Sequence, residues 1–421
     1  MAFLTNHARI DDSDQFIIML DSAGSYDPAP NVVFNKSIDN RIFNSTGSNF
    51  GVSLAANNSH LVVGAYMKDS GNDQSVGAVY LFNLEGDSDT REILPGSTIG
   101  DGGTHYYGAT SAANNIIVAS APFDDVYNYY EGSVFIFHND SEHNRLIPPE
   151  TEPAIQFGKS VSMGNGRIAA STDDSNGQVL LFDYEGSNIA KIQGRNANQS
   201  NPSFGQGTLG QGNGIVIGNG RIAIGDQGSS REDGAVHLYD LNANLIKILD
   251  DPTTDNEGRF GRVLAIGNNR LLVGEPYHDD STSDVGVGGT NLTSSGRAHL
   301  YDLNGNLIKR IRPPQLGYGH RFGFEVTIGN NVLAIGSPGD SAGYVFLYDL
   351  SGNKIQDIPS PDNNIAYGNT LANYGFGANV HIHRDKLYTS HLQAGTASQG
   401  KVYVYDFPST QTHLLDLLND F

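Results

Sequence analysis

The chain has 421 residues, a formal net charge of −21 and no cysteine. This acidity excludes nucleic acids and anionic membrane surfaces as partners, because like charges repel. The lack of cysteine excludes disulfides and thiolate metal sites, and no run reaches the ~18 apolar residues of a membrane-spanning helix.

The N-terminal 40 residues read as an arm or linker. The opening segment, MAFLTNHARIDDSDQ, lacks the basic and apolar regions of a secretory signal. Gln15 to Leu20 is apolar enough to form a strand, and Asp27 to Pro30 predicts an extended linker.

A Phe-Gly or Tyr-Gly pair then recurs along the chain. In the copy that starts at Phe260, two short apolar runs flank the turn Gly267 to Arg270, and two more flank the turn Asp302 to Asn306. Runs of about 4 to 6 residues bounded by Gly, Asn and Asp are typical of hairpin strands. Each copy therefore predicts four antiparallel strands. The seven pairs are Phe50-Gly51, Tyr107-Gly108, Phe157-Gly158, Phe204-Gly205, Phe260-Gly261, Phe322-Gly323 and Tyr374-Gly375.

The spacing of these copies, near 50 residues, indicates a β-propeller. One four-stranded sheet cannot bury both of its faces, whereas seven sheets arranged radially can. We predict an all-β, seven-bladed β-propeller of four-stranded antiparallel blades over residues 41–405, an N-terminal arm over 1–40 and a C-terminal tail over 406–421.

Two segments compete to supply the last strand of the seventh blade. Ile38 to Phe43 precedes the first Phe-Gly pair much as other fourth strands precede theirs, and Thr412 to Leu418 follows Tyr405 at the usual spacing. One closes the ring and the other is free to dock elsewhere. If the arm is separate, deletion of residues 1–37 leaves the ring folded.

The repeats resemble the FG-GAP repeats of the integrin α-chain propeller, and more closely their short bacterial and viral variant. The "GAP" element survives, for example as Ser120-Ala121-Pro122, Gly274-Glu275-Pro276 and Gly336-Ser337-Pro338. The resemblance implies the fold but little about function, because propellers perform many unrelated tasks. Integrin-type repeats often carry calcium loops between strands 1 and 2. Here those turns are Asn-Gly or Asn-Asn, so the calcium sites are not carried over.

Strand alternation divides the turns between two faces. Turns 1–2 and 3–4 are short and share one face, the tight-turn face, whereas the long 2–3 loops and the linkers between blades share the other, the variable-loop face. Aromatic side chains in variable loops suit protein or glycan interfaces. We therefore predict a binding site formed by Tyr66, Tyr106, Phe123, Tyr127, Tyr129, Tyr130, Tyr277 and His278.

Several short patterns resemble catalytic, nucleotide-binding or metal-binding motifs, but each has a simpler explanation. Gly339 to Gly343 fits G-x-S-x-G, and Gly205 to Gly210 fits G-x-G-x-x-G, but neither is followed by the helix that its chemistry requires. His381 and His383 share a strand face without a clear third ligand, which favours packing or surface roles. The acidic clusters, including Asp124-Asp125, Asp279-Asp280 and the Asp302 turn, fit Asx turns or solvated loops. We expect no catalytic residue, metal or cofactor.

These observations favour a non-enzymatic structural or binding protein. FG-GAP-like propellers are mostly exported surface proteins, so the missing export signal favours a bacteriophage virion component, such as a tail, fibre or capsid decoration protein. Its arm or tail would contact other virion proteins, and its loops those proteins or a host surface protein or glycan. The alternative is a bacterial cell-surface or secreted adhesin that binds protein or glycan. A hydrolase would need carboxylates, or a His–carboxylate pair, in the central channel, and the sequence places none there.

Overall fold

A computed structural model describes residues 8–10, 16–18, 32–39, 50–65, 77–84, 90–93, 110–113, 115–124, 131–138, 141–148, 156–173, 177–194, 204–205, 214–226, 234–253, 258–281, 291–314, 317–339, 343–361, 375–392, 394 and 400–407. These residues form strands and turns but no helix. Accordingly, no helix in the described part of the chain could span a membrane.

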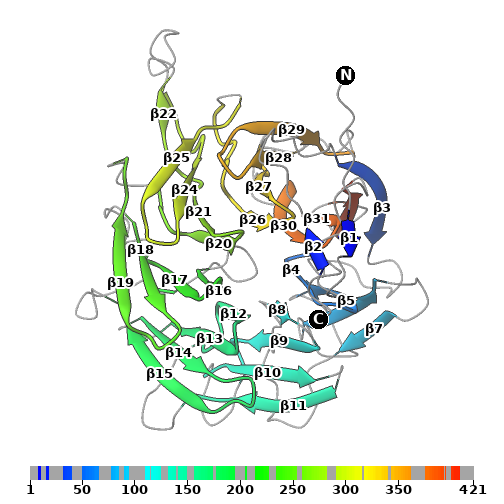
Figure 1. The fold of residues 1–421 in the computed structure, drawn as a ribbon, viewed down its shortest axis with the longest axis vertical. Helices are drawn as coiled ribbons and strands as arrows, with labels where there is room; N and C mark the ends of the chain where they lie inside the picture. Colours follow the sequence, from blue (N-terminus) through cyan, green and yellow to red (C-terminus); the bar gives the residue numbers. More distant parts are fainter. Residues whose placement is uncertain are drawn as a thin grey trace.

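Seven four-stranded antiparallel sheets surround a central channel, so the predicted fold is confirmed (Figure 1). Each of the first six blades runs outward in chain order from an innermost to an outermost strand. Blade 1 contains β4 (Ser53–Ala56), β5 (His60–Ala65), β6 (Ala78–Asn83) and β7 (Thr90–Ile93), and blade 2 contains β8 (Thr110–Ala113), β9 (Ile116–Ala121), β10 (Ser133–His138) and β11 (Ser141–Leu146). Blade 3 contains β12 (Val161–Gly164), β13 (Arg167–Thr172), β14 (Gln178–Phe182) and β15 (Asn188–Gln193), and blade 4 contains β16 (Ile215–Gly218), β17 (Arg221–Asp226), β18 (Ala235–Asp240) and β19 (Leu245–Asp250). Blade 5 contains β20 (Val263–Gly267), β21 (Arg270–Glu275), β24 (Arg297–Asp302) and β25 (Leu307–Ile311), and blade 6 contains β26 (Val326–Gly329), β27 (Val332–Ser337), β28 (Tyr344–Asp349) and β29 (Lys354–Pro359).

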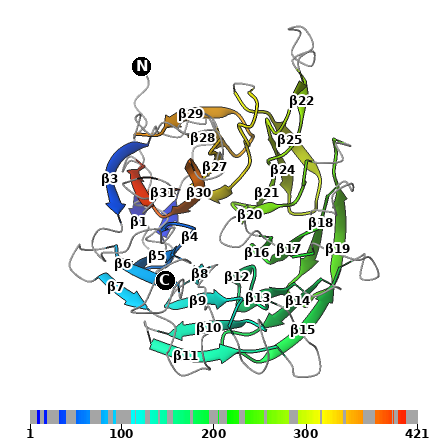
Figure 2. The same ribbon diagram turned by 180° about the vertical axis from the view of Figure 1, so that it is seen from behind.

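Blade 7 is made from both ends of the repeat region. It contains β30 (Phe376–His383), β31 (Lys386–His391) and β32 (Lys401–Asp406), and its outermost strand is β3 (Val33–Asp39). Figure 2 shows β3 on the outer side of β31 and β30, seen from the back of the ring. The N-terminal side thus closes the ring, but with Val33–Asp39 rather than with the predicted Ile38 to Phe43, of which residues 40–43 lie outside the described residues. The ring therefore begins at Val33 rather than at residue 41. Thr412 to Leu418 lies outside the described residues.

Two small sheets lie outside the blades. β1 (Ala8–Ile10) pairs with β2 (Phe16–Ile18), which falls within the apolar run that predicted a strand. β22 (Asp280–Ser281) pairs with β23 (Asn291–Leu292) in the long 2–3 loop of blade 5.

The core is divided into layers between neighbouring blades. The seven largest clusters of buried apolar side chains each join two adjacent blades, and the series closes where blade 7 meets blade 1. Both faces of most blades are therefore covered. This arrangement explains why the second and third strands of the repeats are buried along nearly their whole length.

The Phe-Gly pairs hold these layers together. The six described phenylalanines of the pairs are fully buried: Phe50, Phe157, Phe204, Phe260, Phe322 and Phe376. The last of these corrects the seventh copy, because Phe376-Gly377 occupies the position expected for Tyr374-Gly375. Gly343 packs on the backbone of Phe376, with a parallel bridge, just as Gly296 packs on Phe322 one blade earlier. Tyr107-Gly108 lies outside the described residues.

On the tight-turn face, neighbouring blades are clamped by side chains of the 1–2 turns. Asn165 and Gly166 have φ values of 49° and 76°, which confirms the left-handed turn expected from Asn-Gly. The arginine after each such turn reaches a carbonyl in the 3–4 turn of the next blade: Arg167 Nε donates to Leu241 (3.2 Å), Arg221 Nε to Leu303 (3.2 Å) and Arg270 Nε to Leu350 (3.1 Å). The 1–2 and 3–4 turns therefore do share one face.

Candidate binding site on the variable-loop face

Tyr277 stands on the variable-loop face at the junction of blades 5 and 6. It follows β21 with only Pro276 between them, and its backbone N–H donates to the Gly258 carbonyl (3.2 Å) in the linker before blade 5. Its half-buried ring is surrounded by guanidinium groups. The guanidinium carbon of Arg259 lies 4.6 Å from the ring centroid, and those of Arg262 and Arg321 lie 5.4 Å away.

The repeat itself explains two of these arginines. Arg259 and Arg321 each precede a Phe-Gly pair, and both adopt left-handed backbone with φ of 57° and 56°. Gln156 has the same conformation (φ 59°) before the pair of blade 3. In blades 3, 5 and 6 the residue before the pair therefore shares one backbone conformation. In blades 5 and 6 that residue is an arginine, and its guanidinium group lies beside Tyr277.

Arg262 is the buried member of the group, with 2% of its surface exposed. Its guanidinium carbon lies 4.5 Å from the Phe324 ring centroid on one side and faces Tyr277 on the other. Burial lowers the pKa of Arg262 and the nearby charge of Arg259 lowers it further, while Glu325 raises it. Three guanidinium groups therefore gather around one ring, and Glu325 acts on only the buried one of them.

A buried hydrogen-bond network fixes the loop that carries Tyr277. Glu275 is fully buried and accepts from His299 Nε2 at Oε2 (2.7 Å) and from Thr253 Oγ1 at Oε1 (3.0 Å). His278 Nδ1 lies 3.1 Å from the same Oε1. Burial alone raises the pKa of Glu275, but the hydrogen bonds from His278 and His299 outweigh it and hold the pKa at about 2. The carboxylate is therefore ionised at neutral pH.

The network continues toward the small β22–β23 sheet. His278 Nε2 lies 3.9 Å from Asp280 Oδ1, and the buried Asp280 accepts from Arg297 Nη2 at 2.5 Å. Only 4% of the His278 surface is exposed. This predicted site residue is therefore part of the buried network that fixes the loop, rather than a group that a partner could contact. Asp280 belongs to a cluster that we expected to be solvated or to form Asx turns, yet its side chain is buried and paired with Arg297.

Phe123 holds in blade 2 the position that Tyr277 holds in blade 5. It is half-buried, and the next residue, Asp124, is buried and accepts hydrogen bonds from Ser133 and Arg145. Phe123 and Tyr277 belong to different blades, and the structure does not bring them into one contact. The other predicted aromatic residues lie outside the described residues: Tyr66, Tyr106, Tyr127, Tyr129 and Tyr130.

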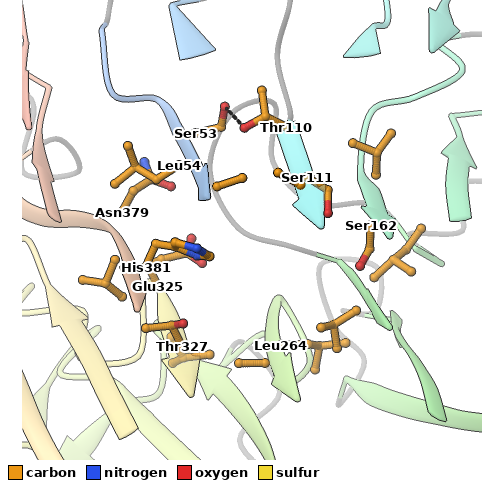
Figure 3. Close-up of a pocket in the computed structure, with 18 of the residues that line it drawn as sticks. Ser53, Leu54, Thr110, Ser111, Ser162, Leu264, Glu325, Thr327, Asn379 and His381 are labelled. Atoms are coloured by element: carbon orange, nitrogen blue, oxygen red, sulfur yellow. Dashed lines mark hydrogen bonds between the residues drawn. The ribbon is translucent and has the colours of Figure 1, made fainter. Parts of the chain in front are cut away.

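The central channel contains a second candidate, a cavity of about 200 Å³ lined by the innermost strand of every blade (Figure 3). Serine hydroxyls form hydrogen bonds between neighbouring innermost strands. The hydroxyls of Ser53 and Thr110 share a hydrogen bond (3.1 Å), and Ser162 Oγ accepts from the backbone N–H of Ile217 (3.1 Å). Glu325 and His381 also line the cavity. Burial, with a smaller contribution from His383, lowers the pKa of His381 to about 3. A neutral imidazole with so low a pKa is poorly matched to acid–base work near neutral pH.

The aromatic pattern of the loops does not indicate the arginine group. A sequence signal for it exists, since arginine directly precedes the Phe-Gly pair in two consecutive copies. The placement of Arg262 between two aromatic rings required the structure.

Comparison with known proteins agrees with the fold. Residues 44–82 match the model of the FG-GAP repeat. No curated protein sequence matched the chain. A chain in a solved structure of the mitotic checkpoint complex shares 11% identity with a TM-score of 0.53, covering 93% of this chain and 96% of that one. BamB from Moraxella catarrhalis shares 10% identity with a TM-score of 0.46, covering 90% and 100%. At 11% identity, the chain of the checkpoint complex shows similarity of fold only.

The class of protein follows from the ring of blades: it is a seven-bladed β-propeller. More narrowly, it carries an FG-GAP repeat, matched over a segment that includes β4, β5 and β6 of blade 1. FG-GAP propellers are generally non-catalytic binding domains, which suggests a binding or structural role.

Proposed function

We propose that this protein is a non-enzymatic structural or binding protein that docks an acidic protein surface at Tyr277. The observation that carries the proposal is the group of three guanidinium groups around the Tyr277 ring, in a chain whose net charge is −21. Arginine and tyrosine dominate the energetic centres of protein interfaces. A local cationic group on an acidic molecule gives the orientation and selectivity that such an interface needs.

For the biological setting we propose a bacteriophage virion, in its tail, a fibre or a capsid decoration. The support is a rigid closed ring with two distinct faces, together with a β1–β2 hairpin that is not needed to complete any blade. In this proposal the variable-loop face contacts a neighbouring virion protein or the host surface, and the N-terminal segment before β3 or the C-terminal tail contacts a second neighbour. The alternative is a cell-surface or secreted adhesin, which would use the same face to bind protein or glycan.

Fractionation of the native source tests the setting. We expect mass spectrometry to recover the chain with purified virus particles at constant stoichiometry through successive gradients. Recovery only in the envelope of uninfected cells would contradict the virion setting and support the adhesin. Neither outcome alters the prediction for the docking surface.

Matched variants test the docking surface. Arg259→Glu reverses the charge of an exposed side chain and should weaken association with the partner by about tenfold or more, with a marked dependence on salt concentration. Lys354→Glu makes the same charge change on β29, where the side chain is 43% exposed near the tight-turn face, and should leave association unchanged. Equal effects of the two variants would show that only overall charge matters.

A further inference from the structure

The 3–4 hairpins of blades 3 to 6 follow a common pattern. An aspartate follows the last aromatic residue of the third strand, and its Oδ1 accepts from two backbone N–H groups of the turn. In blade 5, for example, Asp302 accepts from Asn304 (2.9 Å) and Asn306 (2.8 Å). The fourth strand then contains a β-bulge whose extra residue is isoleucine. These bulged residues are Ile189, Ile246, Ile308 and Ile355.

Blade 2 departs from this pattern at both positions, and both departures are to histidine. His138 takes the place of the aspartate at the end of β10, and His143 takes the place of the bulged isoleucine in β11. The two imidazole rings stack in parallel, with centroids 4.0 Å apart and an interplanar angle of 7°. Two imidazoles thus replace a turn-capping carboxylate and an aliphatic side chain.

A third polar residue lies opposite them in blade 3. Glu185, in the 3–4 turn of that blade, takes the place held by the uncharged Asn242 in blade 4, Asn304 in blade 5 and Ser351 in blade 6. Its Oε2 lies 3.0 Å from His143 Nε2. One ligand atom from each of His138, His143 and Glu185 lies within 4.8 Å of the other two.

The site spans a joint between blades that the repeat normally closes with hydrogen bonds. Asn144 Nδ2 donates to the Glu185 carbonyl (2.8 Å), as Lys247 Nζ donates to the Gly305 carbonyl (2.8 Å) between blades 4 and 5. The ordinary joint is therefore still made, and the histidines and carboxylate are added to it. The β10–β11 hairpin and the β14–β15 hairpin lie side by side along the rim (Figures 1 and 2).

We propose that His138, His143 and Glu185 bind a divalent ion of borderline softness, with Zn²⁺ as the best match, and so pin blade 2 to blade 3. Two imidazoles and one carboxylate are a ligand set that Zn²⁺ accepts, with water at the fourth position. A surface ion pair between His143 and Glu185 would explain two of the three residues. It does not explain His138, whose Nε2 is shielded from solvent and has no hydrogen-bond partner among the described residues.

This inference revises the expectation that no metal is bound and is independent of the docking surface at Tyr277. An ion that binds only the folded protein raises its stability with ion concentration. The ion would therefore strengthen one joint of the ring at a fixed place.

The test is a titration of the full chain with Zn²⁺, by calorimetry and by thermal unfolding against a chelator-treated sample. We expect one equivalent to bind and the melting temperature to rise, whereas Ca²⁺ and Mg²⁺, which prefer all-oxygen sites, have no such effect. The variants take residues from other blades: His138→Asn copies Asn83 of blade 1, His143→Ile copies blades 3 to 6, and Glu185→Asn copies blades 4 and 5. Each should weaken Zn²⁺ binding by more than roughly tenfold. Glu142→Gln, at an exposed neighbouring carboxylate, should leave it unchanged.

Unchanged Zn²⁺ affinity in His143→Ile and Glu185→Asn would overturn the proposal, because the binding would then come from other side chains. Circular dichroism first checks that each metal-free variant is folded, before any titration. Should a variant not fold, Co²⁺ absorption of the unmodified protein decides: a visible spectrum of tetrahedral type that Zn²⁺ displaces supports the site, and its absence overturns it.

Discussion

At the scale of single residues, the charge of Glu275 organises the loop beneath Tyr277. Its fully buried carboxylate accepts hydrogen bonds from His299 and Thr253 and lies within hydrogen-bond distance of His278. The three partners come from the linker before blade 5, the 2–3 loop and β24. The loop is therefore tied to the body of the blade through one carboxylate.

Glu275→Gln should reduce the free energy of unfolding by about 2 kcal/mol at neutral pH, because hydrogen bonds to a charged acceptor are lost. The pKa of the folded carboxyl is about 2 against an ordinary 4.5, so the contribution is complete above pH 4.5 and disappears as the pH falls toward 2. The difference from the unmodified protein in urea unfolding should shrink over that interval. Glu142→Gln, at an exposed carboxylate, should change stability by less than about 0.5 kcal/mol. Equal losses in the two variants would contradict the role of Glu275.

His381 in the channel wall makes stability depend on pH in the range below neutrality. Burial holds its pKa at about 3 in the folded protein, against an ordinary 6.5. Between these values the unfolded chain binds a proton that the folded protein does not, so stability falls as the pH falls. His381→Gln should reduce this slope by about 1.4 kcal/mol per pH unit between pH 6.5 and 4, measured by urea unfolding. Parallel curves for the two proteins would show that His381 is readily protonated in the channel.

At the scale of elements, each blade depends on the glycine of its Phe-Gly pair. Gly261 has φ of 85°, and a Cβ there would lie 2.7 Å from the Ala235 carbonyl of the preceding blade. Gly166 in the 1–2 turn of blade 3 has φ of 76°, but a Cβ there would meet nothing within 4 Å. A side chain at either position would adopt a strained left-handed backbone, but only at Gly261 would it also collide with the neighbouring blade.

Gly166→Ala should cost about 1 kcal/mol, the strain of left-handed backbone alone. Gly261→Ala should cost about 1 to 3 kcal/mol more, because the blade interface is also overpacked. Chemical unfolding of both variants measures the difference. If the losses were equal, close packing at the Phe-Gly pair would not be what fixes the spacing between blades.

Repeated elements could be predicted from the sequence, and single departures from the repeat could not. Seven apolar patterns and the Asn-Gly turns defined blades, strands and faces, because each pattern recurs with the same physical cause. The seventh Phe-Gly pair was placed two residues early, since Tyr374-Gly375 fits the motif but Phe376-Gly377 fits the packing of Gly343. The arginines around Tyr277 and the histidines of blade 2 involve residues from separate repeats, and their meeting is visible only once neighbouring blades are in place.

At the scale of the whole molecule, the ring is closed by hydrogen bonds between its two ends. β3 pairs with β32 from Val33 to Asp39. Just before β3, the Val32 backbone N–H donates to Gln356 Oε1 (2.8 Å), and Gln356 Nε2 donates to the Val32 carbonyl (3.2 Å). Residues 33–37, which we had assigned to a separable arm, are therefore part of blade 7.

Deletion of residues 1–30 should leave the melting temperature nearly unchanged, whereas deletion of residues 1–37 should lower it markedly, because it removes most of β3 and exposes the edge of β32. Differential scanning calorimetry of the two truncated proteins distinguishes these outcomes. A ring equally stable after both deletions would mean that another segment can replace β3.

The proposed function requires that the variable-loop face, and not the tight-turn face, contacts the partner. The most direct measurement is site-specific crosslinking in the native source, with a photo-reactive amino acid in place of the exposed Tyr318, in the linker before blade 6 on the variable-loop face, or of Lys354 near the tight-turn face. Position 318 leaves the three arginines intact, and we predict that it forms a discrete crosslink to an acidic protein partner and that position 354 does not. A crosslink from position 354 with none from position 318 would contradict docking at Tyr277.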